Sequence, residues 1–264
     1  MSPVASRLGA FALLLVGTFA TAYAVGEKLP GHSHSGAGHT HSHSGMNMGT
    51  PVPPGFENGG YQLVTEGVAD GVATFHLNDA KGRPVSDFTE AHGAILHTII
   101  IRPDLSDFNH VHPTIDANGS WSVKMPGSGP WHVVFDSTPT GASGPIVVAA
   151  NIDDEAPVAT VALPPPNDTV EIDGLIVTRV GFNFMFENAD GSEVKGLEPY
   201  LGQASHLVAI RQGDLAYTHL HPSGDMSGMF MFDSGITEPG TYRLFLQFGR
   251  NGKVLTVPFT VVVA

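Results

Sequence analysis

The chain contains the same short pattern twice, and this repetition restricts the folds that it can adopt. His-x-His-Pro occurs as HVHP at residues 110–113 and as HLHP at residues 219–222. A shift of 109 residues, the difference between 110 and 219, relates the flanking segments HTIIIRPDLSDFNHVHPTIDANG and HLVAIRQGDLAYTHLHPSGDMSG. Self-similarity at a fixed offset indicates that one structural unit is present twice. We therefore expect two copies of a domain of about a hundred residues.

Both copies have the pattern of β-strands. Short runs rich in Val, Ile, Phe and Thr, such as GVATFHL, WHVVF and YRLFLQF, are separated by Gly, Asp, Asn and Pro. Many short strands at this spacing, without a sustained helical period, are typical of a β-sandwich. The sequence predicts an all-β protein with two tandem Ig-like or cupredoxin-like β-sandwich domains, at residues 61–152 and 169–264. The segment between them, 153–168, is rich in Pro and acidic residues and is predicted to be a linker.

The N-terminus has the form of a secretory signal peptide. Arg7 gives a basic start, an apolar stretch follows at 8–19, and Ala22-Tyr23-Ala24 fits the small-x-small cleavage rule. We expect a signal peptide at residues 1–24, a secreted, periplasmic or cell-envelope location, and no stable membrane insertion after cleavage. A retained membrane anchor is the alternative, although the apolar stretch is short for a spanning helix.

The composition excludes several classes of protein. There is no cysteine, which rules out thiolate metal sites, iron–sulfur clusters and the blue-copper cysteine ligand, and means that an exported chain must be stable without disulfides. The chain has 12 Lys and Arg against 25 Asp and Glu. Such an acidic balance disfavours nucleic acid and anionic membranes as partners.

Three histidines in each copy occupy matching positions, and these are the candidate metal ligands. They are His97, His110 and His112 in the first copy and His206, His219 and His221 in the second. The second half contains no other histidine, so a merely solvating role does not explain the match. If each pair of strands forms a centred hairpin, the first histidine lies roughly opposite the third, and the second shares its face because strand side chains alternate. A register slip of one residue would turn the first histidine to the other face.

Three imidazoles on one patch suit Zn(II), Cu(II) or Ni(II) and leave a coordination position open. A His-lined patch used for packing or for a pH response is the alternative. Residues 25–60 are rich in Gly, His, Ser and Pro and are predicted to be a disordered tail. The tail holds auxiliary candidate ligands: His32, His34, His39, His41, His43, Met46 and Met48. Because thioethers favour Cu(I), the tail and the triads together favour copper, with zinc as the alternative.

An exported, cysteine-free β-sandwich chain with paired histidines resembles the bacterial copper-handling proteins of the CopC and YtkA-like kind. The resemblance implies an Ig-like or cupredoxin-like fold and copper binding in the cell envelope. The chain departs from CopC because no histidine stands at the predicted mature N-terminus, where CopC-type sites place one. No residue roles are therefore carried over.

These observations predict an exported metal-binding protein that buffers, stores or delivers copper, with one tris-His site in each domain. The expected partners are metal ions, and a metal donor or acceptor protein is a further candidate. The alternatives are a zinc-binding protein, a tris-His metalloenzyme of hydrolytic or redox type, and an Ig-like interaction module with the triads between domains or chains. An enzyme is disfavoured because no nucleophile elbow, Ser/His/Asp grouping or paired-carboxylate motif is apparent, and no clear general base accompanies both triads.

Overall fold

The computed structural model describes residues 55–264, apart from 92, 153–158, 193 and 227. The chain divides into two compact units, Met1–Ser44 and Gly45–Ala264, and the described residues all belong to the second. The predicted signal peptide, the tail ligands from His32 to Met48 and part of the predicted linker therefore lie outside the described residues. Within the described part of the chain, no helix is long and apolar enough to cross a membrane.

Every regular element in the described residues is a β-strand, and the strands form two sandwich-like units of two sheets each. The first unit contains β1 (Glu57–Asn58), β2 (Tyr61–Ala69), β3 (Val72–Asn78), β4 (Phe88–Thr89), β5 (Leu96–Ile101), β6 (Asn109–Val111), β7 (Ser120–Lys124), β8 (Trp131–Pro139) and β9 (Ile146–Ile152). One sheet has the order β1-β2-β3-β7, and the other has the order β4-β8-β5-β6 with β9 paired to the free side of β8. We call this unit the first repeat.

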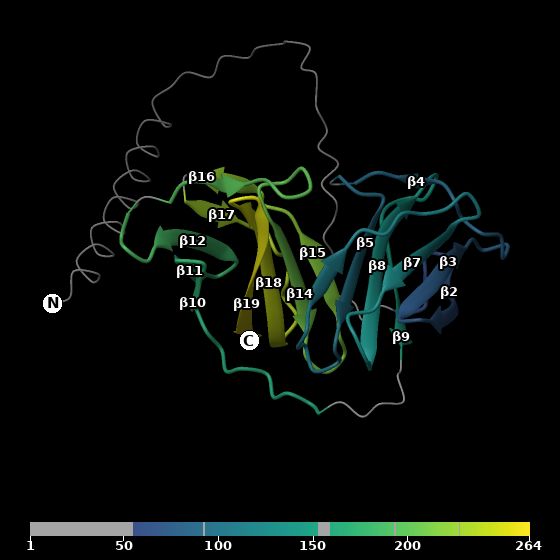
Figure 1. Cartoon of the computed structure of the whole chain (residues 1–264), viewed down its shortest axis with the longest axis horizontal. Coiled ribbons are helices and arrows are strands. Elements are labelled where there is room, and N and C mark those ends of the chain that lie inside the picture. The colour runs from purple at the N-terminus through teal and green to yellow at the C-terminus, as the bar shows by residue number, and fades with distance from the viewer. Residues whose placement is uncertain (1–54, 92, 153–158, 193, 227) are drawn as a thin grey trace, which may run out of the picture. The chain divides into compact units, whose positions relative to one another are not determined.

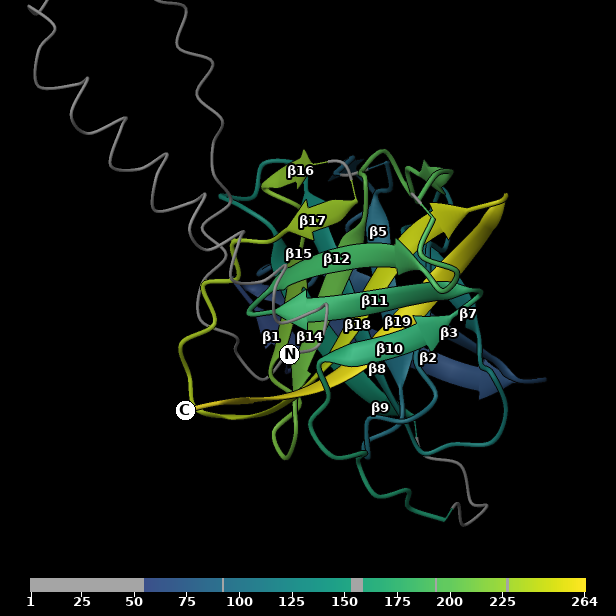
Figure 2. The same ribbon diagram turned by 90° about the vertical axis from the view of Figure 1, so that its left-hand side faces the viewer.

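The second repeat has the same plan (Figures 1 and 2). It contains β10 (Thr169–Ile172), β11 (Leu175–Val180), β12 (Asn183–Asn188), β13 (Leu197–Glu198), β14 (His206–Arg211), β15 (Tyr217–Leu220), β16 (Gly224–Met226), β17 (Met229–Met231), β18 (Gly240–Arg250) and β19 (Lys253–Val263). Its sheets have the orders β10-β11-β12-β17-β16 and β13-β18-β14-β15, with β19 paired to β18. Figure 2 shows β10, β11, β12 and β17 as a layer in front of β18 and β19. The predicted all-β fold with two tandem β-sandwich units is confirmed.

Each sandwich encloses its own apolar core because its strands turn alternate side chains inward. In β3, for example, Ala73, Phe75 and Leu77 are buried while the residues between them are partly exposed. They pack against inward residues of the facing sheet, such as Phe135, whose ring lies 4.8 Å from that of Phe75. The second core is built in the same way around Phe184, Phe248 and Phe259.

The two inner hairpin strands, β5 and β14, are buried on both faces. All six residues of β5 are buried, and five of the six in β14. One face of each strand belongs to its own core, whereas the other belongs to a third apolar cluster drawn from both repeats. We call this cluster the inter-repeat core: Ile99, Ile101, Leu105, Val134, Ala149, Val208, Ile210, Tyr217 and Phe245. The sheet that contains β5 therefore packs against the sheet that contains β14 (Figure 1).

An aromatic stack anchors the inter-repeat core. The ring of Phe108 lies on that of Phe245 with a centroid distance of 4.0 Å and an interplanar angle of 12°. The two residues come from opposite repeats, and Phe245 is 4% exposed. A stacked aromatic pair adds to the stabilisation that burial of apolar surface gives.

At one point the strands depart from the predicted limits. The tail was expected to extend to residue 60, but Glu57–Asn58 forms β1, which pairs with the start of β2. The side-chain amide of Asn58 donates a hydrogen bond to the carbonyl of Val147 in β9, so this part of the predicted tail is attached to the first repeat. The sequence did not indicate this strand because its residues are polar and exposed, and the strand is held by backbone pairing instead of by burial of apolar side chains.

Candidate metal centre

The hairpin register places the predicted histidines as the sequence indicated. In the first repeat, Thr98 pairs with Val111 and Ile99 pairs with His110, so one further step brings His97 opposite His112. In the second repeat, Val208 pairs with His219, and Leu207 pairs with Leu220. The next step along this register brings His206 opposite His221. Both hairpins thus fold about the centres of their loops.

Strand alternation turns these histidines away from the sandwich cores and towards the opposite repeat. On β5, His97 shares its face with Ile99 and Ile101, which belong to the inter-repeat core, whereas Leu96 and Ile100 face the core of the first repeat. On β14, His206 likewise shares its face with Val208 and Ile210 of the inter-repeat core. The sites therefore lie where the two sheets meet, at one end of the inter-repeat core.

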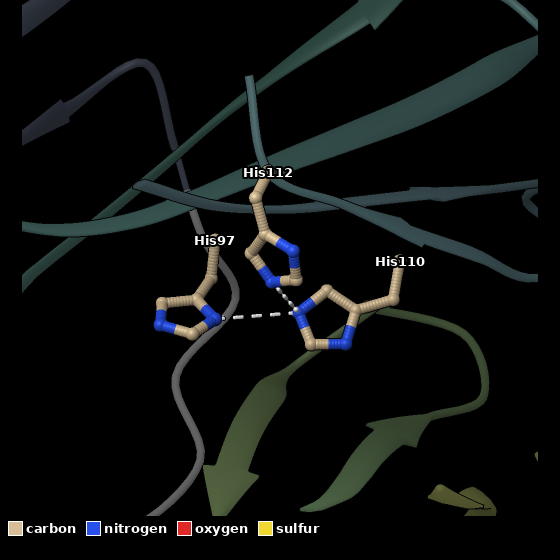
Figure 3. Close-up of side chains that lie close together, drawn as sticks. All are labelled: His97, His110 and His112. Atoms are coloured by element: carbon tan, nitrogen blue, oxygen red, sulfur yellow. Dashed lines mark hydrogen bonds between the residues drawn. The ribbon is translucent and has the colours of Figure 1, made fainter. Parts of the chain in front are cut away.

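In the first triad the ring nitrogens of three histidines converge (Figure 3). Nδ1 of His97 lies 3.4 Å from Nε2 of His110, which lies 3.2 Å from Nε2 of His112. His97 is 4% exposed, and the other two are partly buried. In a tetrahedral site with metal–nitrogen bonds of about 2.0–2.1 Å, neighbouring nitrogens lie about 3.3 Å apart. Two of the three nitrogen pairs of the first triad therefore have the spacing that a single ion needs, and all three nitrogens lie within 4.8 Å of one another.

The second triad has the same form and is more deeply buried. Nδ1 of His206 lies 3.0 Å from Nε2 of His219. The ring of His221 is 4.9 Å from that of His206 and 4.6 Å from that of His219, centroid to centroid. His206 is fully buried, and His219 is 7% exposed. In each triad, one nitrogen from each ring lies within 4.8 Å of the others, so each triad could hold a metal ion.

Backbone carbonyls fix the protonation of the first histidine in each triad. Nε2 of His97 donates to the carbonyl of Ala91 at 3.0 Å, and Nε2 of His206 donates to that of Tyr200 at 2.9 Å. A carbonyl can only accept a hydrogen bond, so the proton lies on Nε2 and the Nδ1 lone pair faces the other rings. Ala91 and Tyr200 occupy equivalent positions of the two repeats, in short backbone turns that close on Ala94 and Gln203.

The middle histidine of each triad meets a polar side chain of the opposite repeat. Nδ1 of His110 lies 2.7 Å from Oε1 of Gln247, whose amide nitrogen donates to Thr256. Nδ1 of His219 lies 3.6 Å from a carboxylate oxygen of Asp136. The Gln247 oxygen accepts a hydrogen bond from His110, and the Asp136 carboxylate faces His219 at ion-pair distance. Each favours the proton on Nδ1 and leaves the lone pair on Nε2, the nitrogen that faces the triad.

Asp136 and Gln247 are not among the candidate residues predicted from the sequence. They are equivalent residues of β8 and β18, because Asp136 pairs with His97 and Gln247 pairs with His206 in adjacent strands. Their residue types differ, and their offset is 111 rather than 109 because the intervening loops differ by two residues. Strand alternation could have revealed them. Asp136 is two residues from Val134, and Gln247 is two residues from Phe245, so each shares the strand face that points to the opposite repeat.

The two triads adjoin each other. The ring of His97 lies 5.0 Å from that of His219, and the ring of His110 lies 5.5 Å from that of His219 and 6.1 Å from that of His206. Within the first triad the centroid distances are 4.7–5.6 Å. The spacing between triads is thus close to the spacing within them. We call the six residues together the six-histidine cluster.

Other described histidines lie outside the cluster. Nδ1 of His76 lies 2.8 Å from the carboxylate of Glu66 on the exposed sheet of the first repeat. His132 lies against the side-chain oxygen of Asn151 at 2.8 Å. These two residues offer matched controls, since each is a histidine with a polar partner but without a triad.

Burial disfavours protonation of the cluster. It lowers the pKa of His110 well below the ordinary value, and the nearby rings of His219, His112 and His97 lower it further while Gln247 opposes the shift. Burial, with a contribution from His97, lowers the pKa of His112 to about 4. Neutral imidazole, the form that binds metal, is therefore retained to a lower pH than in solvent.

We expect the metal-free protein to lose stability as the pH falls from about 6.5 to about 4. Because the pKa values of His110 and His112 are lower in the folded chain, the unfolded chain binds protons first, and unfolding becomes easier as the pH drops. The stabilisation that depends on keeping both imidazoles neutral is fully present above the ordinary histidine pKa and is lost as the pH falls through the lower folded-state values. Urea unfolding in a chelator, at about pH 7.5 and about pH 5, measures the loss. The variant with His110→Ala and His112→Ala should show a smaller loss; an equal loss would contradict the assignment.

Fold and site together define the class: a protein of two β-sandwich repeats with two adjoining tris-His groups that could hold metal. The chain belongs to the family described as a domain of unknown function, DUF8832, which matches residues 62–150 and 167–264. The family is thus present twice, once in each repeat. No curated protein is similar to the chain by sequence.

Two of the solved structures that match illustrate how weak the similarity is. The FN1–FN3 domains of chicken CNTN1 are 14% identical, with a TM-score of 0.21, over 81% of this chain and 69% of that one. Invasin, a bacterial integrin-binding protein, is 14% identical with a TM-score of 0.19, over 75% of this chain and 39% of that one. The chain thus spans well under half the length of invasin.

Proposed function

We propose that this chain is an exported metal-binding protein that buffers, stores or delivers copper. The observation that supports the proposal is the convergence of three imidazole nitrogens in each repeat, with the lone pairs of the first and middle histidines aimed inward by outer acceptors. The two inward-facing lone pairs of each triad repel each other unless a proton or a cation lies between them. A donor set of imidazole alone suits Cu(II) and Zn(II), and the Met and His residues of the tail favour copper of the two.

The triads are suited to reversible holding of an ion. Three protein ligands leave a position through which a donor or acceptor can exchange ligands with the bound ion. The open ends of the hairpins contribute His112 and His221, which are only partly buried. In this proposal the tail captures ions and passes them to the triads by ligand exchange.

Metal binding is tested on the full chain in which the seven tail ligands are replaced by serine, here called the tail-silenced chain. We expect it to bind about two copper ions tightly in competition with chelators, and to lose this binding when His110, His112, His219 and His221 are changed to alanine. The control carries His76→Ala and His132→Ala and should bind as the parent does. Competition with zinc in the same assay can exclude copper as the cargo, because tighter binding of zinc would run against the usual order, in which nitrogen ligands hold Cu(II) more tightly than Zn(II). Tight binding that survives loss of the four triad histidines would refute the proposal.

A further inference from the structure

We propose that the two triads form one two-ion centre shared by the repeats, in which each repeat supplies the residue that positions the middle histidine of the other. This inference rests on the proposed metal-binding function and adds to it. Two separate sites would be enough to hold two ions, and metal storage alone does not require the two sites to lie next to each other. The geometry of the inter-repeat face points to a single centre.

The first line of evidence is distance. The rings of His97 and His219 are 5.0 Å apart although they belong to different repeats, whereas His97 and His110 of one triad are 5.6 Å apart. His206 lies 6.3 Å from His97 and 6.1 Å from His110. Ions held by the two triads would therefore be neighbours, with no protein layer between them to screen one from the other.

The second line of evidence is the crossed arrangement of the outer partners. Gln247 of the second repeat contacts His110 of the first, and Asp136 of the first repeat contacts His219 of the second. Each of these residues stands beside the first histidine of its own repeat in the sheet but contacts the middle histidine of the other. Gln247 is 4% exposed, and both ends of its amide are engaged. Gln247 and Asp136 are thus positioning residues, since each acts on a metal through a histidine.

The partners differ in charge, which makes the two ions inequivalent. Asp136 brings a carboxylate to the second triad, whereas Gln247 brings a neutral amide to the first. A carboxylate beside the outer nitrogen of a histidine favours the proton on that nitrogen and makes the metal-facing nitrogen more basic. We infer that the second triad, His206, His219 and His221, takes the first ion, and that the first triad takes the second ion less tightly because two cations repel.

Electron paramagnetic resonance of the tail-silenced chain loaded with Cu(II) tests the shared centre. One equivalent should give the spectrum of an isolated ion, and two equivalents should give a broadened or weakened spectrum because neighbouring spins couple. The variant with His110→Ala and His112→Ala should bind one ion and give only the isolated spectrum. A single ion per chain, or two ions whose spectra simply add, overturns the two-ion centre. The second of these outcomes leaves the proposed function standing, whereas no binding at all defeats both.

The crossed positioning has its own test, made in the background with His219→Ala and His221→Ala, where only the first triad remains. Gln247→Ala should weaken copper binding about 10- to 100-fold, although Gln247 belongs to the other repeat. Gln247→Glu should restore or tighten binding, because it places a carboxylate where the other repeat has one. Asn151→Ala, which removes the amide partner of His132, is the matched control and should change nothing. Unchanged affinity in Gln247→Ala overturns the crossed positioning.

Discussion

Replacing His110 and His219 together with alanine abolishes the stabilisation that metal gives to the folded protein. Each is the middle ligand of its triad, and each has its outer nitrogen against a residue of the other repeat. A ligand that binds only the folded state at about a hundred times its dissociation constant adds about 2.7 kcal/mol to the free energy of unfolding. The parent should gain about this amount from each fully occupied site, and the double variant should gain almost none.

Thermal or urea unfolding of the tail-silenced chain, with and without copper or zinc, measures this gain. The control with His76→Ala and His132→Ala also loses two histidines, but both lie outside the six-histidine cluster. Its metal-free stability can differ from that of the parent, yet the increment from metal should not. If the double variant kept the increment of the parent, the ions would be held elsewhere.

The second large effect is on the contact between the repeats. Phe245→Ala should lower the free energy of unfolding by about 3–5 kcal/mol, because it removes a buried aromatic ring and leaves a cavity. Phe245 is 4% exposed, stacks on Phe108 of the first repeat at 4.0 Å, and belongs to the inter-repeat core. Because Gln247 is two residues further on the same face of β18, copper affinity should fall as well.

Urea unfolding measures the first effect, and chelator competition measures the second. Phe56→Ala is the matched control: Phe56 is 60% exposed, so its loss should change stability by no more than about 0.5 kcal/mol. A Phe245→Ala protein as stable as the Phe56→Ala protein would mean that the repeats do not pack through this face in solution.

Much of the candidate site could be predicted from the sequence, because it is local to a hairpin. The positions of His97, His110 and His112 follow from strand alternation and from a loop centred between two apolar runs. The second copy repeats this pattern independently, which makes a chance arrangement improbable. The fold class follows in the same way from short apolar runs between turn residues.

The contact between the two triads could not be predicted from the sequence, because it depends on how the two sheets pack against each other. One local sign exists: β5 reads LHTIII, with little of the alternation that a half-exposed strand shows, because both of its faces are buried. That sign does not say what covers the second face. Asp136 and Gln247 lie on β8 and β18, outside the hairpin of their own repeat, and each contacts a histidine of the opposite repeat. Spacing within a repeat therefore carries no information about them. Copper, export and the tail ligands stay predictions.

The crossed contacts have a consequence for the history of the chain. A protein with one such repeat could build this arrangement only as a symmetric homodimer, in which both subunits necessarily place the same side chain behind the middle histidine. Duplication within one gene removes that constraint. The two copies can then diverge, and here one carries Asp136 where the other carries Gln247. The tandem chain therefore corresponds to a fused dimer whose two halves are no longer identical, with one tighter and one weaker metal site.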